Sequence, residues 1–144
     1  MDIRLCVEND LKACSDTYAK VFNEAPWNEA WTTETAFSYL IDFYQTPGFT
    51  GVVAVENEEV IGFLFGVKRK WWSGDEFFIN EMCVRTDQQS KGVGKALMEY
   101  LIETTDAEMI SLLTDRGLPA ETFYKRNGFK EIERIMFMSR DVLK

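Results

Sequence analysis

Histidine is absent from this sequence of 144 residues. Ser-His and Cys-His nucleophile systems and most zinc-hydrolase mechanisms need an imidazole, so the sequence excludes them. A catalytic acid or base must therefore be Glu, Asp, Tyr, Cys or Lys. Cysteine is scarce as well: Cys6, Cys14 and Cys83 form no CxxC pair, and their odd number and scatter argue against a disulfide framework or a zinc site. We expect core thiols and no bound metal.

The sequence also lacks a long apolar run and an excess of positive charge. No stretch approaches the roughly 20 apolar residues that span a bilayer. The first ten residues carry acids where a secretory signal carries a basic region. The net charge of −8 argues against binding to nucleic acid phosphates and suits a cationic small molecule or a basic peptide, although acidity also serves solubility alone. We therefore expect a cytoplasmic protein with no membrane or nucleic acid partner.

The rest of the composition is that of a globular protein, with 46% apolar and 28% charged residues. The length predicts a single domain over residues 1–144. Periodicity predicts an α/β (α+β) order of strand, two helices, three strands, helix, strand, helix and one or two closing strands. In that order, the expected elements span residues 2–7, 11–23, 32–44, 51–56, 60–68, 77–84, 93–101, 109–114, 119–126 and 129–138.

The most informative segment, residues 82–97, places a glycine-containing loop between a predicted strand and a predicted helix. The first N–H groups of a helix lack intrahelical partners and carry the positive end of the helix dipole, so a pyrophosphate fits there. Gly92 and Gly94 would let the backbone approach that anion without a Cβ. A Gly-x-Gly pair alone is equally typical of a tight turn. The sequence has no GxxxxGK[ST] loop and no GxGxxG motif.

Two motifs, in order, resemble those of the GNAT superfamily of acetyl-CoA-dependent N-acetyltransferases. Gln89-x-x-Gly92-x-Gly94, after a strand and before an amphipathic helix, resembles the pyrophosphate motif (Arg/Gln)-x-x-Gly-x-(Gly/Ala). Residues 120–129 resemble the second CoA motif, Ala-x-x-Phe-Tyr-x-x-x-Gly-Phe. The resemblance implies a mixed, largely antiparallel central sheet of about six to seven strands flanked by about four helices, and acetyl-CoA as the cosubstrate.

The resemblance also implies where the cosubstrate binds. The backbone at a strand end would pair with the pantetheine arm as an added strand does, through Met82, Cys83 and Val84. The following loop would bind the pyrophosphate through Gln89, Ser90, Lys91, Gly92, Val93, Gly94 and Lys95. A thiol in an apolar strand without a histidine partner is normally inert, so Cys83 is not expected to carry the acyl group.

Acetyl transfer to an amine needs a base, because an amine with a pKa of about 10.4 is protonated at pH 7. Glu81 is the first candidate: many family members carry Glu just before this strand end, and burial among apolar neighbours would raise its pKa. Two alternatives stay open, a water held by Asn80 and the carboxylate of Glu76. Tyr124 occupies the position from which the family's tyrosine donates a proton to the CoA thiolate.

The acceptor is expected at the loop between the first two helices, which forms one wall of the acceptor cleft in proteins that this sequence resembles. Trp27 and Trp31 beside Glu24 and Glu29 would hold a cation by π and charge contacts. Packing of two aromatic residues within a loop explains the tryptophans equally well. Asn80 completes the predicted substrate-binding residues.

The sequence therefore predicts transfer of an acetyl group from acetyl-CoA to a primary amine by direct attack, with general base assistance. The acceptor would be a small cationic amine, an aminoglycoside-like sugar or a protein amine, and the sequence does not distinguish among them. The rival hypothesis is a noncatalytic acyl-CoA-binding or sensing module. Trp71 and Trp72, at a predicted hairpin tip, are exposed candidates for an acceptor or homodimer contact.

Overall fold

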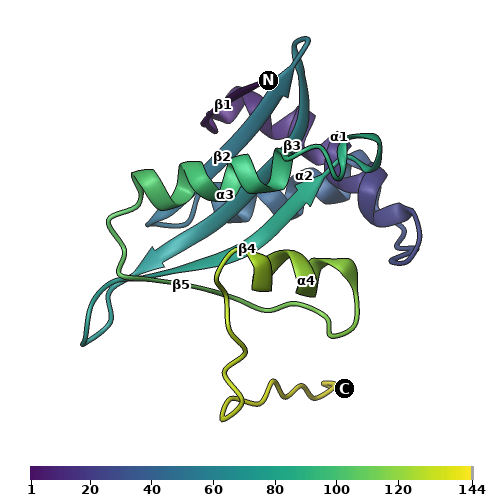
Figure 1. Ribbon diagram of the computed structural model, residues 1–144. Helices are drawn as coiled ribbons and strands as arrows, with labels where there is room; N and C mark the ends of the chain where they lie inside the picture. The colour runs from purple at the N-terminus through teal and green to yellow at the C-terminus, as the bar shows by residue number, and fades with distance from the viewer. Residues whose placement is uncertain (144) are drawn as a thin grey trace. The chain divides into compact units, whose positions relative to one another are not determined.

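The computed structural model describes residues 1–143 (Figure 1). Their contacts divide them into two compact units, Met1–Leu113 and the residues from Thr114 onward. All of the described strands belong to the first unit. The expectation of a single domain stays a prediction.

The first unit is built on one sheet of five strands: β1 (Asp2–Leu5), β2 (Phe49–Glu56), β3 (Glu59–Arg69), β4 (Glu76–Val84) and β5 (Met109–Leu112). The strands lie in the order β1-β2-β3-β4-β5. The pairs β1–β2, β2–β3 and β3–β4 are antiparallel, and β5 is parallel to β4. This mixed, largely antiparallel sheet with helices confirms the predicted fold class.

The described chain has four α-helices: α1 (Leu11–Asn23), α2 (Thr33–Tyr44), α3 (Val93–Thr104) and α4 (Pro119–Arg126). The start of α2 follows from its sequence, because Thr32 and Thr35 cap each other. The Thr35 N–H donates to Thr32 Oγ1 at 3.0 Å, and the Thr32 N–H donates to Thr35 Oγ1 at 2.9 Å. No helix in residues 1–143 combines the length and the apolar character that crossing a membrane requires.

Helices cover both faces of the sheet. α1 and α2 pack against each other and against one face, and α3 lies on the opposite face (Figure 1). The core on the α1/α2 side includes Leu11, Cys14, Leu40, Phe63 and Phe65. On the α3 side, Leu97 and Leu101 are buried. Burial on both faces accounts for the nearly continuous apolar runs of β2 and β3.

β4 contains one residue more than its partner β3 at Asn80, which forms a β-bulge. Phe65 of β3 pairs with Glu81, and the next residue, Gly66, pairs with Ile79, so Asn80 has no partner on β3. In a regular strand Ile79 and Glu81 would project to the same face of the sheet. The bulge reverses this alternation, so Glu81 lies on the α1/α2 face with Phe65.

The predicted closing strands at residues 129–138 are wrong. In the described part of the chain after α4 there is no strand, and the Ile135 N–H donates to the carbonyl of Ile132 at 3.1 Å in a local turn. The apolar side chains of this segment are exposed, including Met136, Phe137 and Met138. The apolar pattern predicts a strand, but a strand forms only where a neighbouring strand supplies hydrogen bonds. The pattern does not indicate which segment of the chain would be that neighbour. The described sheet therefore has five strands rather than six to seven.

Trp71 and Trp72 lie between β3 and β4, as the sequence predicts. Their side chains are 60% and 87% exposed, respectively. Exposed aromatic side chains of this size are typical of contact surfaces. Their role in an acceptor or homodimer contact stays a prediction.

Candidate functional site

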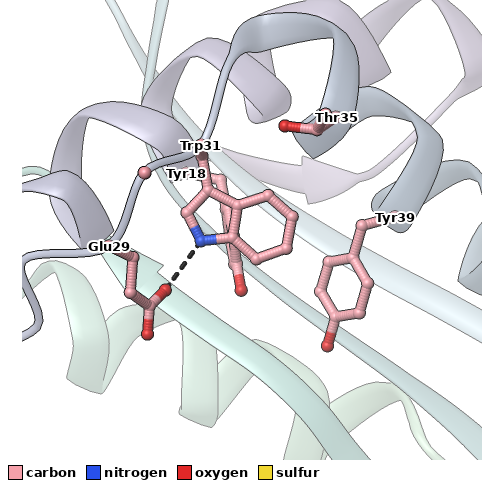
Figure 2. Close-up of a pocket in the computed structure, with 6 residues that line it drawn as sticks. Tyr18, Glu29, Trp31, Thr35 and Tyr39 are labelled. Carbon is pink, nitrogen blue, oxygen red and sulfur yellow. Dashed lines mark hydrogen bonds between the residues drawn. The ribbon is translucent and has the colours of Figure 1, made fainter.

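A pocket of about 550 Å³ lies between α1, the following loop and α2 (Figure 2). Its lining is aromatic and polar, with Tyr18, Glu29, Ala30, Trp31, Thr35 and Tyr39. Tyr18 comes from α1, Tyr39 comes from α2, and the intervening loop supplies Glu29 and Trp31. All of these residues belong to the first unit.

Short hydrogen bonds hold the loop in place. The side chain of Asn23, at the end of α1, accepts from the Trp31 N–H and donates to the Trp31 carbonyl, both at 2.8 Å. The Glu29 N–H donates to the carbonyl of Phe22 at 2.9 Å. The indole N–H of Trp31 donates to Glu29 Oε1 at 2.7 Å (Figure 2). The loop that forms this wall of the pocket is therefore fixed by hydrogen bonds to α1 and within itself.

Three aromatic rings pack together on one side of the pocket. The ring centroids of Tyr18 and Trp31 are 5.1 Å apart, those of Trp31 and Tyr39 are 5.4 Å apart, and those of Tyr18 and Tyr39 are 5.7 Å apart. Aromatic pairs at such distances and tilts stabilise each other beyond simple area burial. The cluster orients the two phenol groups.

Both phenols donate to the Glu81 carboxylate on β4. The Tyr39 hydroxyl donates to Glu81 Oε1 at 2.5 Å, and the Tyr18 hydroxyl donates to the same oxygen at 3.4 Å. Within residues 1–143, no hydrogen bond to Glu81 Oε2 is formed. The two tyrosines therefore orient the half-buried carboxyl group and leave its second oxygen available.

Burial raises the pKa of the Glu81 carboxyl above its usual range. The hydrogen bonds from Tyr39 and Tyr18 oppose this increase, and the charge of Glu29 adds to it. Burial also raises the pKa of both phenols, so they stay protonated donors at neutral pH. A carboxyl group with a raised pKa is suited to taking and returning a proton near neutral pH.

Replacing Tyr39 with phenylalanine is expected to raise the pKa of Glu81 further, because a short hydrogen bond that stabilises the carboxylate is lost. Hydrogen bonds to charged groups contribute about 1.5–3 kcal/mol. An NMR titration of the side-chain carboxyl carbons measures the change. Tyr18→Phe is the matched control, and its longer hydrogen bond predicts a smaller increase. Equal midpoints in the wild type and in Tyr39→Phe would contradict this account of Glu81.

The two alternative candidates for the base have different surroundings. Asn80 Oδ1 is buried and has no hydrogen-bond partner within residues 1–143, so it is an acceptor suited to a ligand N–H or a water. Glu76 lies at the opposite end of β4, where its Oε1 accepts from the Ser111 hydroxyl at 2.6 Å. The Glu76 carboxylate is therefore engaged in the β4–β5 pairing region.

The outer edge of β4 is open beyond Ile79. β5 pairs with β4 only from Glu76 to Ile79, so the later residues of β4 pair with β3 alone. These later residues include Met82, Cys83 and Val84. An open strand edge with free backbone groups can accept another extended chain. Cys83 can offer only its backbone to such a chain. Its side chain is buried, and burial raises the pKa of its thiol.

The loop before α3 leaves backbone donors free. The first bond of the helix runs from the Ala96 N–H to the Gly92 carbonyl at 3.0 Å. The N–H groups of Val93, Gly94 and Lys95 have no acceptor within residues 1–143. Gly92 adopts a left-handed conformation with φ +83°, and a Cβ placed there would meet nothing within 4 Å. Such an uncovered helix start suits an anion.

The other predicted pyrophosphate residues surround this helix start. Gln89 Nε2 donates to the carbonyl of Val84 at 3.0 Å and so ties the loop to the end of β4. Ser90 has a left-handed backbone with φ 64°. Lys91 and Lys95 are exposed, and Lys95 Nζ lies 3.8 Å from a Glu99 carboxylate oxygen. Lys91 in the loop and Lys95 in the first turn of α3 therefore add two cations near the free N–H groups.

Three of the predicted substrate residues, Glu24, Trp27 and Asn80, do not line the pocket. Glu24 Oε1 accepts from the Thr86 hydroxyl at 3.3 Å. The Trp27 ring packs on Phe22, with centroids 5.4 Å apart. Sequence reasoning missed Tyr18 and Tyr39, because each lies on an apolar helix face where it is expected to be a core residue. The signal in the sequence was the phenol group of each residue, which needs a hydrogen-bond partner when it is buried.

Tyr124 lies on α4 in the second unit. Its ring packs against Phe129, with centroids 5.6 Å apart, and its side chain is half-buried. The Phe129 N–H donates to the Tyr124 carbonyl at 3.0 Å, which closes the end of α4. Within residues 1–143, no group of three or more Cys, Asp or Glu residues is placed to hold a metal ion.

Solved structures share this fold across nearly the whole chain. A transcriptional regulator from Bacillus halodurans is 20% identical, with 96% of this chain and 99% of that chain covered and a TM-score of 0.78. AAC(6')-Iy, in complex with a bisubstrate analogue containing CoA, is 17% identical, with 98% of each chain covered and a TM-score of 0.75. An aminoglycoside acetyltransferase from an uncultured soil metagenomic sample is 19% identical, with 99% and 98% covered and a TM-score of 0.72. At these identities the likeness shows the fold alone.

The family is shown by a comparison of sequences. A comparison with curated proteins finds no match. A family model described as "Acetyltransferase (GNAT) domain" matches residues 47–131, more than half of the chain. The match includes β2 to β5, the loop before α3 and the residues of α4. The chain therefore belongs to the GNAT superfamily of acetyltransferases.

Proposed function

We propose that the protein transfers an acetyl group from acetyl-CoA to a primary amine by direct attack, with Glu81 as the general base. The observation that carries this proposal is the Glu81 carboxyl group, whose Oε1 is held by two phenols and whose Oε2 stays available within residues 1–143. The group lies on β4 just before the open edge formed by Met82, Cys83 and Val84. A base and an acyl donor would therefore lie side by side.

The reaction removes two protons from the ammonium nitrogen and supplies one proton to the CoA thiolate. An amine with a pKa of about 10.4 arrives as an ammonium ion, and Glu81 Oε2 takes a proton from it. The neutral nitrogen attacks the thioester carbonyl carbon, and the tetrahedral intermediate loses a second proton from nitrogen to solvent and breaks its C–S bond. The CoA thiolate then takes a proton, and Tyr124 is the proposed donor. Asn80 Oδ1, a buried acceptor without a partner in the described chain, is suited to orienting the amine N–H.

Two features of the first unit support the placement of acetyl-CoA. The backbone edge of Met82–Val84 would pair with the pantetheine arm, as a strand is added to a sheet. The free N–H groups at the start of α3, with Lys91 and Lys95 nearby, would bind the pyrophosphate. Cytoplasmic location remains a prediction from the sequence.

A screen of primary amines with acetyl-CoA tests the proposal. We expect CoA thiol release that depends on the amine, together with a mass increase of one acetyl group on that amine. Small amines, aminosugars and peptides with free lysine or N-terminal amines form the panel. Tight acetyl-CoA binding without transfer to any amine would instead support the noncatalytic acyl-CoA-binding module.

A further inference from the structure

Two carboxylates without a cationic partner lie at the pocket or directly beside its lining tyrosines. Glu29 lines it, and Glu81 bonds to two of its lining tyrosines. Within residues 1–143, neither carboxylate takes part in an ion pair, whereas ten ion pairs form elsewhere. The charge of Glu29 also acts on Tyr18, Tyr39 and Glu81. The pocket therefore has a negative charge that the described chain does not neutralise.

The two carboxylates differ in their surroundings. Glu81 is half-buried and held by phenols. Glu29 is exposed at the pocket, and its Oε1 is held at 2.7 Å by the indole N–H of Trp31 (Figure 2). The indole in turn packs on Tyr18 and Tyr39. Glu29 is thus an oriented, solvated carboxylate beside an aromatic ring, a combination suited to holding a cation.

The chemistry of transfer decides which cation Glu29 can hold usefully. A nitrogen must lose its charge before it attacks the thioester, and a neighbouring carboxylate stabilises the charged form. A persistent charge beside the reacting nitrogen would therefore oppose the reaction. Beside a second cationic centre that stays charged throughout, the same carboxylate binds the substrate without this penalty. Glu81 would then act on the reacting nitrogen, and Glu29 would bind the nitrogen that stays charged.

We propose that the acceptor carries two cationic nitrogens, of which Glu81 deprotonates one and Glu29, with the Trp31 ring, holds the other. This inference rests on the proposed function and narrows its substrate class to diamines and amines with a second positive centre. A monoamine can interact with Glu81 but has no second cation for Glu29.

Diaminobutane and butylamine form a matched pair of acceptors, since they differ only in the second amine. The wild type should acetylate diaminobutane with a KM at least about tenfold lower than its KM for butylamine, because tenfold corresponds to about 1.4 kcal/mol, close to the lower end of the coupling energies of close charge pairs. In Glu29→Gln this preference should disappear through KM, with kcat little changed. Glutamine keeps an oxygen for the Trp31 indole, so only the charge is lost. Glu34→Gln, an equal loss of charge on the exposed start of α2 outside the pocket, should keep the preference.

The outcomes separate this inference from the proposed function. Equal KM values for the two amines in the wild type, or an equal effect of Glu29→Gln on both, would overturn the inference while transfer itself stands. Calorimetric binding of both amines to the wild type and to Glu29→Gln provides a test that needs no transfer. Loss of diaminobutane binding only in Glu29→Gln supports the inference even when no acetylation is seen. Equal affinities of the wild type for diaminobutane and butylamine would overturn the inference.

Discussion

Replacing Glu81 with glutamine is expected to lower the turnover of amine acetylation by about 100- to 10,000-fold, the usual contribution of a general base. Glutamine cannot take the ammonium proton but can still accept from the hydroxyls of Tyr39 and Tyr18. The affinity for acetyl-CoA should change little, because the open edge of β4 and the loop before α3 remain. Steady-state kinetics with an amine found in the screen, together with acetyl-CoA titration, measure both quantities.

The pH dependence of this variant identifies the mechanism. The deficit should shrink at high pH, where solvent already deprotonates the amine. Turnover equal to that of the wild type at neutral pH would show that Glu81 is not the base, and Glu76→Gln and Asn80→Ala would then be compared. Thermal melts check folding: the raised pKa of Glu81 stabilises the wild type fully at low pH, and this contribution is lost as the pH rises through the folded-state pKa. The stability of the Glu81→Gln variant should not decrease over this pH range, because glutamine does not ionise.

Replacing Gly92 with valine is expected to weaken acetyl-CoA binding by about 10- to 100-fold, since charge-assisted hydrogen bonds contribute about 1.5–3 kcal/mol each. The valine side chain would project into the open space beside the free N–H groups of α3, where the pyrophosphate is proposed to lie. The left-handed backbone at φ +83° adds roughly 1–2 kcal/mol of strain. Calorimetric titration with acetyl-CoA measures the affinity, and urea unfolding measures the strain.

Gly117→Val separates these two effects. Gly117 also has a left-handed backbone, φ +84°, and a Cβ there would likewise meet nothing within 4 Å. It lies between β5 and α4, outside the loop before α3 and outside the second CoA motif, so the variant carries comparable strain without a side chain among the free N–H groups. Acetyl-CoA affinity that is unchanged in a folded Gly92→Val protein, or reduced equally in both variants, would remove the assignment of this loop to the pyrophosphate.

Much of the first unit could be predicted because its signals are local. The reciprocal cap of Thr32 and Thr35, the apolar runs of β2 and β3 and the glycine-containing start of α3 each act within a few residues. The segment 129–138 shows the limit of this reasoning. Its apolar pattern is compatible with a strand, but pairing depends on groups elsewhere in the protein.

The candidate site was only partly predictable for a similar reason. Glu81, Glu29 and Trp31 could be proposed from position and residue type, whereas Tyr18 and Tyr39 have the spacing of core residues on their helices. Their hydroxyl groups reach Glu81 only because α1 and α2 pack side by side on the same face of the sheet. Spacing along one helix contains no information about a partner 42 or 63 residues away.

The bulge at Asn80 lets β4 carry an extra residue without moving the base. Loss of Asn80 would make Ile79 and Glu81 neighbours that project to opposite faces, so Glu81 would still lie opposite Phe65, on the face of both tyrosines. A strand that kept Asn80 but paired it with β3 would instead turn Glu81 toward α3. The unpaired position of Asn80 in the register therefore keeps the carboxylate on the α1/α2 face.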